Sequence, residues 1–204
     1  MTKVKVCGLM ESGHVKTAVE AGVDAIGFVF APSRRRITLD KAIELASLVP
    51  SNVLKIGVFV DATAEEIKRV YESVPLDYIQ YHGNESQEFI GKIGLPSIKV
   101  LSVYSNEDIK RAEKYEVDFI LFDTPGKEFK GGSGETFDWH LLEDVGVPLN
   151  KLILAGGLNP GNVSEAIQRV KPYMVDVSSG VEIDNRKDDD LIRAFVSAVK
   201  NEER

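Results

Sequence analysis

The stretch GVDAIGF, residues 22–28, recurs in altered form as PLDYIQY at residues 75–81 and as EVDFILF at residues 116–122. Each copy opens a short run of apolar, aromatic and β-branched residues. Runs that are apolar almost throughout, rather than at every second position, are typical of strands buried on both faces of a parallel sheet. The repetition therefore indicates a fold assembled from similar strand-containing units.

Eight such runs are spread along the 204 residues, and stretches with helical spacing lie between them. The apolar runs cover residues 3–7, 25–30, 55–60, 78–82, 98–101, 119–123, 152–156 and 174–178, and the clearest helical stretches cover residues 11–22, 38–49, 63–74 and 159–170. Thr38 is in position to cap the second helical stretch, and Asn159 and Pro160 are expected to be the cap and first residue of the fourth.

Regular alternation of strands and helices predicts right-handed crossovers and a parallel sheet. Eight units within 204 residues predict an α/β fold, a single (β/α)8 TIM barrel with parallel strands over residues 1–204. The alternative is an open doubly wound sheet. That fold is disfavoured because CGLMESG, rather than G-x-G-x-x-G, follows the first apolar run.

The charge balance restricts the partners of the protein. The chain has 25 basic and 32 acidic side chains, a net charge of −7, which argues against nucleic-acid and membrane-surface binders. One cysteine excludes an internal disulfide and suits a reducing cytoplasm, and no apolar run is long enough to span a membrane. We therefore expect a cytoplasmic protein that acts on a small-molecule substrate, as a monomer or a homodimer.

In a (β/α)8 barrel the active site lies where the strands end, which places the single cysteine, Cys7, at the predicted mouth. Asp123 ends the sixth apolar run, three strands from the first around the ring and almost across the mouth from Cys7. A substrate between these two side chains would meet one proton-accepting and one proton-donating group. That is the arrangement an isomerase needs.

Glycines and hydroxyls follow the seventh and eighth runs, where barrels of this kind commonly bind phosphate through backbone N–H groups. The residues are Gly156 and Gly157 in LAGGLNP, and Ser178, Ser179 and Gly180 in VDVSSGVE. The alternative is that these glycines serve only as turn residues.

Other polar residues near the strand ends are also candidates for the site. One of Arg34, Arg35 and Arg36 could clamp a carboxylate, although a basic triplet is often only a solvated surface feature. Asp176 could hold sugar hydroxyls, and His82 is either a structural hydrogen-bonding group or a substrate contact. No cluster of His, Cys, Asp and Glu has metal-ligand spacing.

Seven segments spread over essentially the whole chain are, in order, KVKVCGL, GFVFAPSRRRIT, YIQYHGNES, ILFDT, GGSGETFDW, LAGGLNP and VDVSSGVE. Together they resemble the motifs of the phosphoribosylanthranilate isomerase family of tryptophan biosynthesis. One departure is Met10, where the family usually has threonine.

The resemblance implies an Amadori rearrangement with Cys7 as general base and Asp123 as general acid, and with no cofactor or metal. Counting back from Ile37 favours Arg35 for contact with the anthranilate carboxylate, and leaves Arg34 and Arg36 open. Residues 125–139 match the family's flexible loop and are expected to form a lid. We further expect apolar surroundings to raise the pKa of Asp123, and positive potential to favour the Cys7 thiolate.

Two other functions remain open at this point. Asp123 and His82 also fit another aldose–ketose isomerase, although such an enzyme would usually have a lysine in place of Cys7. A non-catalytic barrel that binds a phosphate-containing ligand would need neither Cys7 nor Asp123.

Overall fold

The computed structural model describes residues 1–124, 138–142 and 145–201. Eight parallel strands close a barrel in chain order, and β1 lies between β2 and β8. The strands are β1 (Lys3–Cys7), β2 (Ala25–Val29), β3 (Leu54–Phe59), β4 (Tyr78–Tyr81), β5 (Ser97–Ser102), β6 (Phe119–Asp123), β7 (Leu152–Leu154) and β8 (Met174–Val177). The predicted (β/α)8 barrel is confirmed, and every predicted strand end lies within two residues of the observed one.

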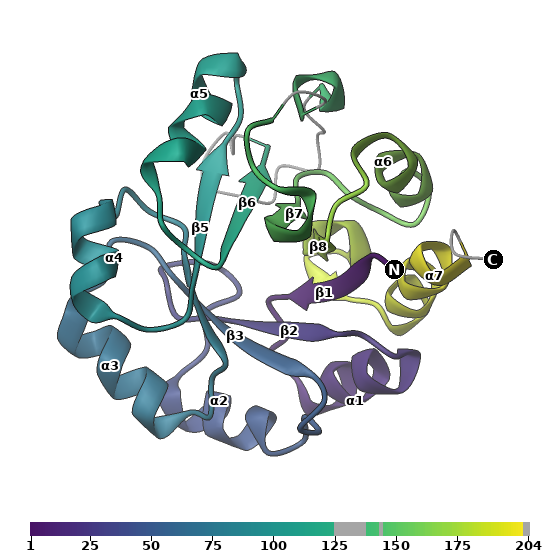
Figure 1. Ribbon diagram of the computed structural model, residues 1–204. Helices are drawn as coiled ribbons and strands as arrows, with labels where there is room; N and C mark the ends of the chain where they lie inside the picture. Colours follow the sequence, from purple (N-terminus) through teal and green to yellow (C-terminus); the bar gives the residue numbers. More distant parts are fainter. Residues whose placement is uncertain (125–137, 143–144, 202–204) are drawn as a thin grey trace.

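The helices form a layer around the outside of the strands (Figure 1). They are α1 (Ser12–Ala21), α2 (Leu39–Ala46), α3 (Ala64–Ser73), α4 (Gln87–Ile93), α5 (Asn106–Lys110), α6 (Val163–Val170) and α7 (Asp189–Asn201). Short 3-10 turns accompany them: η1 (Arg111–Lys114) after α5, η2 (Trp139–Leu142) between β6 and β7, and η3 (Leu149–Lys151) before β7. No helix of the described ranges is both long and apolar enough to cross a membrane.

The predicted helix starts are confirmed in one case and shifted in another. Thr38 caps α2, because its side-chain oxygen accepts a hydrogen bond from the N–H of Lys41 at 3.2 Å. By contrast, α6 begins at Val163 rather than at Pro160. Asn159 still supports the approach to α6, since its side chain accepts from the N–H of Gly161 at 2.8 Å and its carbonyl accepts from that of Val163 at 3.2 Å. The predicted cap is therefore wrong: Asn159 forms these bonds in a turn before the helix, and the N-cap of α6 is Asn162.

Successive strand residues point alternately into the barrel and out towards the helices. In β1, Val4 and Val6 belong to the large apolar cluster shared with the helices, whereas Cys7 packs with Val29, Ala31 and Val58 in a small separate cluster. The middle of the barrel is filled by Ala25, Ile56, Ile98, Val100, Leu121, Ile153, Ala155 and Met174.

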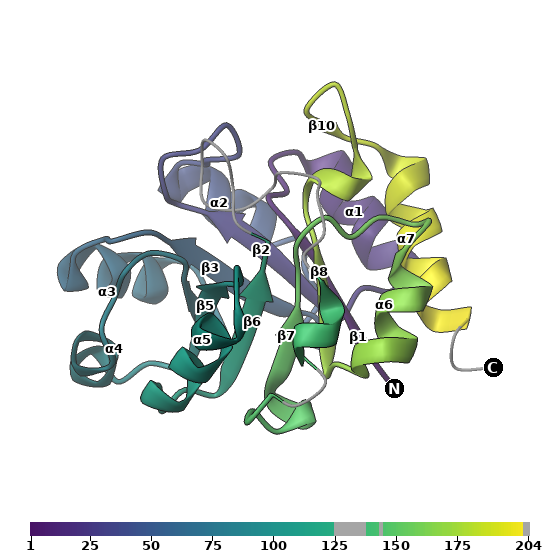
Figure 2. The same cartoon turned by 90° about the horizontal axis from the view of Figure 1, so that it is seen from above.

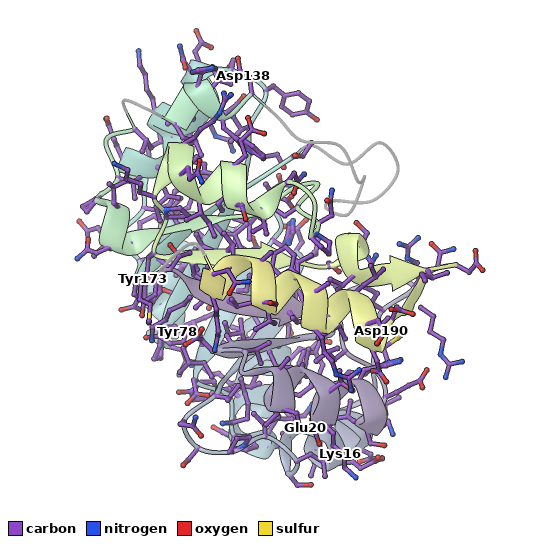
Figure 3. The ribbon with its side chains drawn as sticks, turned by 90° about the vertical axis from the view of Figure 1, so that its right-hand side faces the viewer. Lys16, Glu20, Tyr78, Asp138, Tyr173 and Asp190 are labelled. Carbon is purple, nitrogen blue, oxygen red and sulfur yellow. The ribbon has the colours of Figure 1, made fainter. Side chains whose placement is uncertain are left out.

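Aromatic rings close the end of the barrel where the strands begin. Phe119 stacks on Tyr173 with ring centroids 5.0 Å apart, and meets Tyr78 edge to face at 5.6 Å. Figure 3 shows Tyr78 and Tyr173 at the same end of the molecule. This end is packed with side chains, which leaves the opposite end for a ligand.

The three similar segments at residues 22–28, 75–81 and 116–122 each have an aspartate just before a strand. Two hydrogen bonds join each aspartate to the preceding strand. The Asp24 carboxylate accepts from the N–H of Val4 at 2.9 Å, and the Asp24 N–H donates to the Val4 carbonyl at 2.8 Å. The same two bonds join Asp77 to Lys55 (2.7 and 2.8 Å) and Asp118 to Ser97 (2.8 and 3.1 Å). These three aspartate clamps link β1 to β2, β3 to β4 and β5 to β6, so the repeated sequence encodes a repeated stabilising device.

Asp24→Ala tests the contribution of one clamp. The variant leaves the Val4 N–H without its carboxylate acceptor at a half-buried position, so the free energy of unfolding should fall by about 1–2 kcal/mol in a urea titration. Glu20→Ala, on the exposed outer side of α1 (Figure 3), is the control and should change that free energy by less than about 0.5 kcal/mol. Equal changes in the two variants would show that the clamp contributes nothing specific.

Candidate active site

The predicted site residues meet at the end of the barrel where the strands finish. Here η4 (Ser179–Val181) and a two-stranded hairpin, β9 (Glu182–Ile183) and β10 (Arg186–Lys187), follow β8 (Figure 2). Because β1 and β8 are neighbours, Cys7 and Ser178 lie side by side, and the Ser178 hydroxyl donates to the Cys7 carbonyl at 3.2 Å. The first and last strands therefore contribute to one site.

The thiol of Cys7 occupies space that is free because Gly27 has no side chain. Gly27 is the partner of Cys7 in the register between β1 and β2. A Cβ atom at Gly27 would lie 2.6 Å from Cys7 Sγ, well inside a normal contact distance. Cys7 itself is 8% exposed. The cysteine therefore has a defined place at the mouth of the barrel.

Below Cys7 lies a buried ion pair between Lys5 of β1 and Asp176 of β8. Lys5 and Asp176 are register partners, and Lys5 Nζ donates to Asp176 Oδ2 at 2.6 Å. The Lys5 side chain is fully buried. Among the described residues the other oxygen of Asp176, Oδ1, has no hydrogen-bond partner. Asp176 therefore has one oxygen committed to Lys5 and one available to a ligand.

Burial dominates the titration of the Cys7 thiol. Burial raises the pKa of Cys7, the positive charges of Lys5 and Lys187 oppose the rise, and Asp176 adds to it. The two lysines therefore lower the pKa of Cys7 as expected, but the net pKa still lies above the ordinary thiol value. The cations are present as expected, but the cost of placing a charge in buried surroundings exceeds their effect.

Asp123 ends β6, is buried, and faces His82, the residue that follows β4. His82 Nε2 lies 3.4 Å from Asp123 Oδ2, and Gln80 Nε2 lies 3.5 Å from His82 Nδ1. Burial raises the pKa of Asp176, Lys5 opposes that rise, and Asp123 adds to it. Asp123 is therefore close enough to Asp176 to influence its protonation, and both belong to the same polar interior.

The structure distinguishes the three arginines after β2. Arg34 and Arg36 are exposed, whereas Arg35 is buried and lies over Gly8, where an added Cβ would be 2.5 Å from Arg35 Cδ. Arg35 Nε and Nη2 donate to Glu182 at 2.6 and 2.8 Å. Among the described residues Nη1 of Arg35 has no acceptor. Of the three, Arg35 therefore lies next to the Cys7–Gly8 corner, with one edge of its guanidinium group held by Glu182.

Glu182 links this arginine to the end of β8. Lys187 Nζ donates to Glu182 Oε1 at 2.7 Å and to the Ser178 carbonyl at 2.8 Å. Although burial raises the pKa of Glu182, hydrogen bonds and charges from Arg35 and Lys187 lower it to about 2. Glu182 therefore stays ionised at neutral pH and holds both cations in place.

The loops after β7 and β8 are held close together by glycines. Gly156 and Gly157 have positive φ angles of 88° and 64°, which non-glycine residues rarely adopt. A Cβ at Gly180 would overlap the carbonyl oxygen of Leu158. Within the described residues the N–H groups of Gly156 and Gly157 donate to no protein acceptor. The predicted phosphate loops therefore lie together and carry backbone donors that no described residue occupies.

A hollow of about 780 Å³ lies elsewhere, lined by α4, η1 and the beginnings of β5 and β6. Its lining includes Glu113, Glu116 and Asp118, with Lys151 as a cation. Because the charged residues of this lining are mostly acidic, it does not suit an anionic ligand, and we place the candidate active site at the strand ends. In the part of the chain that the structure describes, no three His, Cys, Asp or Glu side chains are arranged to hold a metal ion.

Sequence reasoning missed Lys5, Gly27, Glu182 and Lys187. Lys5 could have been found from β-strand alternation, because it is two residues from Cys7 and must share its face. Glu182 and Lys187 follow the last apolar run and carry no periodic signal. The predicted lid at residues 125–139 lies outside the described residues except for Asp138 and Trp139.

The chain is similar to known proteins over almost its whole length. A family model described as N-(5'phosphoribosyl)anthranilate (PRA) isomerase matches residues 4–198. N-(5'-phosphoribosyl)anthranilate isomerase from Bacillus cereus is 48% identical over 198 residues, 97% of this chain and 98% of the relative.

Two solved structures are similar over the whole barrel. Phosphoribosyl anthranilate isomerase from Thermotoga maritima has a TM-score of 0.91 and 41% identity, covering 98% of this chain and 100% of that one. A phosphoribosyl anthranilate isomerase in complex with reduced 1-(o-carboxyphenylamino)-1-deoxyribulose 5-phosphate has a TM-score of 0.87 and 38% identity, with the same coverage. The chain belongs to the N-(5'-phosphoribosyl)anthranilate isomerase family.

Proposed function

We propose that this chain catalyses the Amadori rearrangement of N-(5'-phosphoribosyl)anthranilate to 1-(o-carboxyphenylamino)-1-deoxyribulose 5-phosphate in tryptophan biosynthesis. The observation that carries the proposal is the arrangement of Cys7 and Asp123, a thiol and a carboxyl group at the ends of β1 and β6, three strands apart around one barrel mouth. Such a pair can act as base and acid on opposite sides of a sugar.

In the proposed reaction Asp123 donates a proton to the ring oxygen of the ribose. The bond from that oxygen to C1 breaks, and the anthranilate nitrogen supplies electrons to form a protonated Schiff base. Cys7, as thiolate, removes the proton from C2, and the C–H electron pair moves into the C1–C2 bond as the iminium nitrogen is neutralised. The resulting enolamine tautomerises to the 2-ketone. The iminium is the electron sink, so the proposal requires no cofactor.

The surrounding residues fit the three polar parts of this substrate. The backbone donors of Gly156 and Gly157, with Ser178, Ser179 and Gly180, would bind the phosphate. The free edge of Arg35 would bind the anthranilate carboxylate, and Asp176 Oδ1 would accept a hydrogen bond from a ribose hydroxyl. We further propose that residues 1–204 act as one domain in the cytoplasm, as a monomer or a homodimer.

The activity can be tested with freshly generated phosphoribosylanthranilate, by following the loss of substrate fluorescence after the purified protein is added. Loss well above spontaneous hydrolysis, with formation of the ketose product, supports the proposal. Binding of a phosphorylated product analogue without any turnover would reduce the protein to a ligand-binding barrel.

Cys7→Ser and Asp123→Asn test the two assigned roles. Each removes one proton-transfer group at nearly constant size, so kcat should fall by about 10²–10⁴-fold while the variant still binds the product analogue. Either variant turning over at the wild-type rate would remove that residue from the mechanism.

Arg35→Ala tests the carboxylate contact. Loss of a charged hydrogen bond of about 1.5–3 kcal/mol should weaken binding of the product analogue by roughly 10–100-fold in calorimetry. Arg36→Ala, an exposed neighbour, is the matched control and should bind within about twofold of wild type. A larger loss in the Arg36 variant than in the Arg35 variant would reverse the assignment.

A further inference from the structure

Lys5 is a fully buried cation on the same strand and the same face as the only cysteine of the chain. Residues two apart in a strand point in the same direction, about 6.6 Å apart along it. Lys5 therefore lies one layer below Cys7, inside the barrel, where it is bonded to Asp176 at 2.6 Å. Neither the family resemblance nor the proposed proton transfers assign Lys5 a role.

A buried lysine at this position requires an explanation. Burying an ion pair is often no more stabilising than well-packed apolar residues of similar volume. The barrel has apolar residues at equivalent inner positions, such as Ala25 and Ile56. Stability alone therefore gives little reason to place an ammonium group at residue 5, directly below an ionisable thiol.

We propose that Lys5 is a positioning residue whose buried ammonium group stabilises the thiolate form of Cys7, and that Asp176 limits the strength of this effect. The catalytic consequence rests on the proposed function, in which Cys7 removes a carbon-bound proton. A buried thiol without a nearby cation would rarely ionise. A thiolate held by an uncompensated ammonium would be a weak base. With Asp176 bonded to Lys5, the ammonium group favours ionisation of the Cys7 thiol but leaves the thiolate basic enough to remove a proton.

The groups around Cys7 support this arrangement. Lys5 faces it from β1, Asp176 from β8 and Lys187 from β10, and all three influence its titration. The carboxylate of Asp176 and the thiol of Cys7 outweigh the effect of burial on Lys5, so the pKa of Lys5 is raised and it remains an ammonium ion. On the β2 and β3 side, Cys7 meets Gly27, Val29 and Val58, which carry no charge. Arg35 lies above, at Gly8, with Glu182 paired to it.

The test uses the fact that Cys7 is the only cysteine, so alkylation of the intact protein by iodoacetamide reports this thiol alone. The rate of alkylation follows the thiolate fraction, which changes about tenfold for each unit of thiol pKa. In Lys5→Met the inflection of the rate–pH profile should move to higher pH, with at least a tenfold slower reaction near pH 7. In Asp176→Asn it should move to lower pH, with a faster reaction.

Opposite shifts in these two variants distinguish the proposal from a structural role. If Lys5 and Asp176 only held the barrel together, breaking either side of the pair would leave the profile unchanged or would shift it in the same direction in both variants. Either result would overturn the proposal. Lys5→Arg keeps the charge and should retain a profile close to wild type.

Controls address stability and function separately. Lys99→Met breaks another buried ion pair, between Lys99 of β5 and Glu85 at 2.9 Å. Because β5 lies across the ring from β1, this variant should leave the Cys7 profile unchanged.

Should Lys5→Met fail to fold, Lys5→Met/Asp176→Asn removes both charges. Its inflection should still lie above wild type, because Lys5 lies directly below Cys7 on the same strand, whereas Asp176 lies further away on the neighbouring strand. An unshifted double variant would contradict the proposal. The alkylation profile is measured without turnover. The role proposed for Lys5 can therefore fail while the isomerase activity is confirmed, and it can hold while the isomerase activity is not found.

Discussion

The ion pair between Lys5 and Asp176 joins the first and last strands of the barrel at the point where the ring closes. Its two residues are 171 positions apart, yet they are direct partners in the register of β1 and β8. Two residues further along each strand stand Cys7 and Ser178, in hydrogen-bond contact. Any error in this register would therefore separate the thiol from the proposed phosphate-binding loop as well as open the barrel.

From this closure a continuous series of polar contacts leads to the substrate side. Ser178 accepts from Lys187, Lys187 donates to Glu182, and Glu182 holds Arg35. Although the whole chain carries a net charge of −7, buried cations gather here, and each is paired with a carboxylate. The site is therefore nearly charge-compensated, and the phosphate binding proposed here would rely heavily on backbone N–H groups rather than on a free positive charge.

The sequence was sufficient to predict the strands and the closed ring, and to predict which side chains gather at the ends of the strands. Strands buried on both faces have a nearly uninterrupted apolar signal, and their ends point to one face of the barrel. The charged partners were harder to predict. Lys5 looks like an ordinary surface residue within VKVC until Asp176 is placed beside it, and that placement depends on contacts between opposite ends of the chain. For the same reason three adjacent arginines could not be separated until burial showed that Arg35 alone turns inward. The effect of the cations on Cys7 was predicted in the right direction, but the larger effect of burial was missed, because charges are visible in a sequence whereas the cost of burial is not.

The three aspartate clamps also bear on the order in which the chain assembles. They join residues only 20, 22 and 21 positions apart, whereas the pair that closes the ring spans 171. Closing the longer loop costs about 2 kcal/mol more in chain entropy than closing one of the short ones. Local contacts also favour rapid folding. Pairs of neighbouring strands are thus favoured to form first and the ring to close last. Since Cys7 comes from one end of the chain and Asp176 from the other, a nascent chain lacks the candidate active site until synthesis of the final strand is complete.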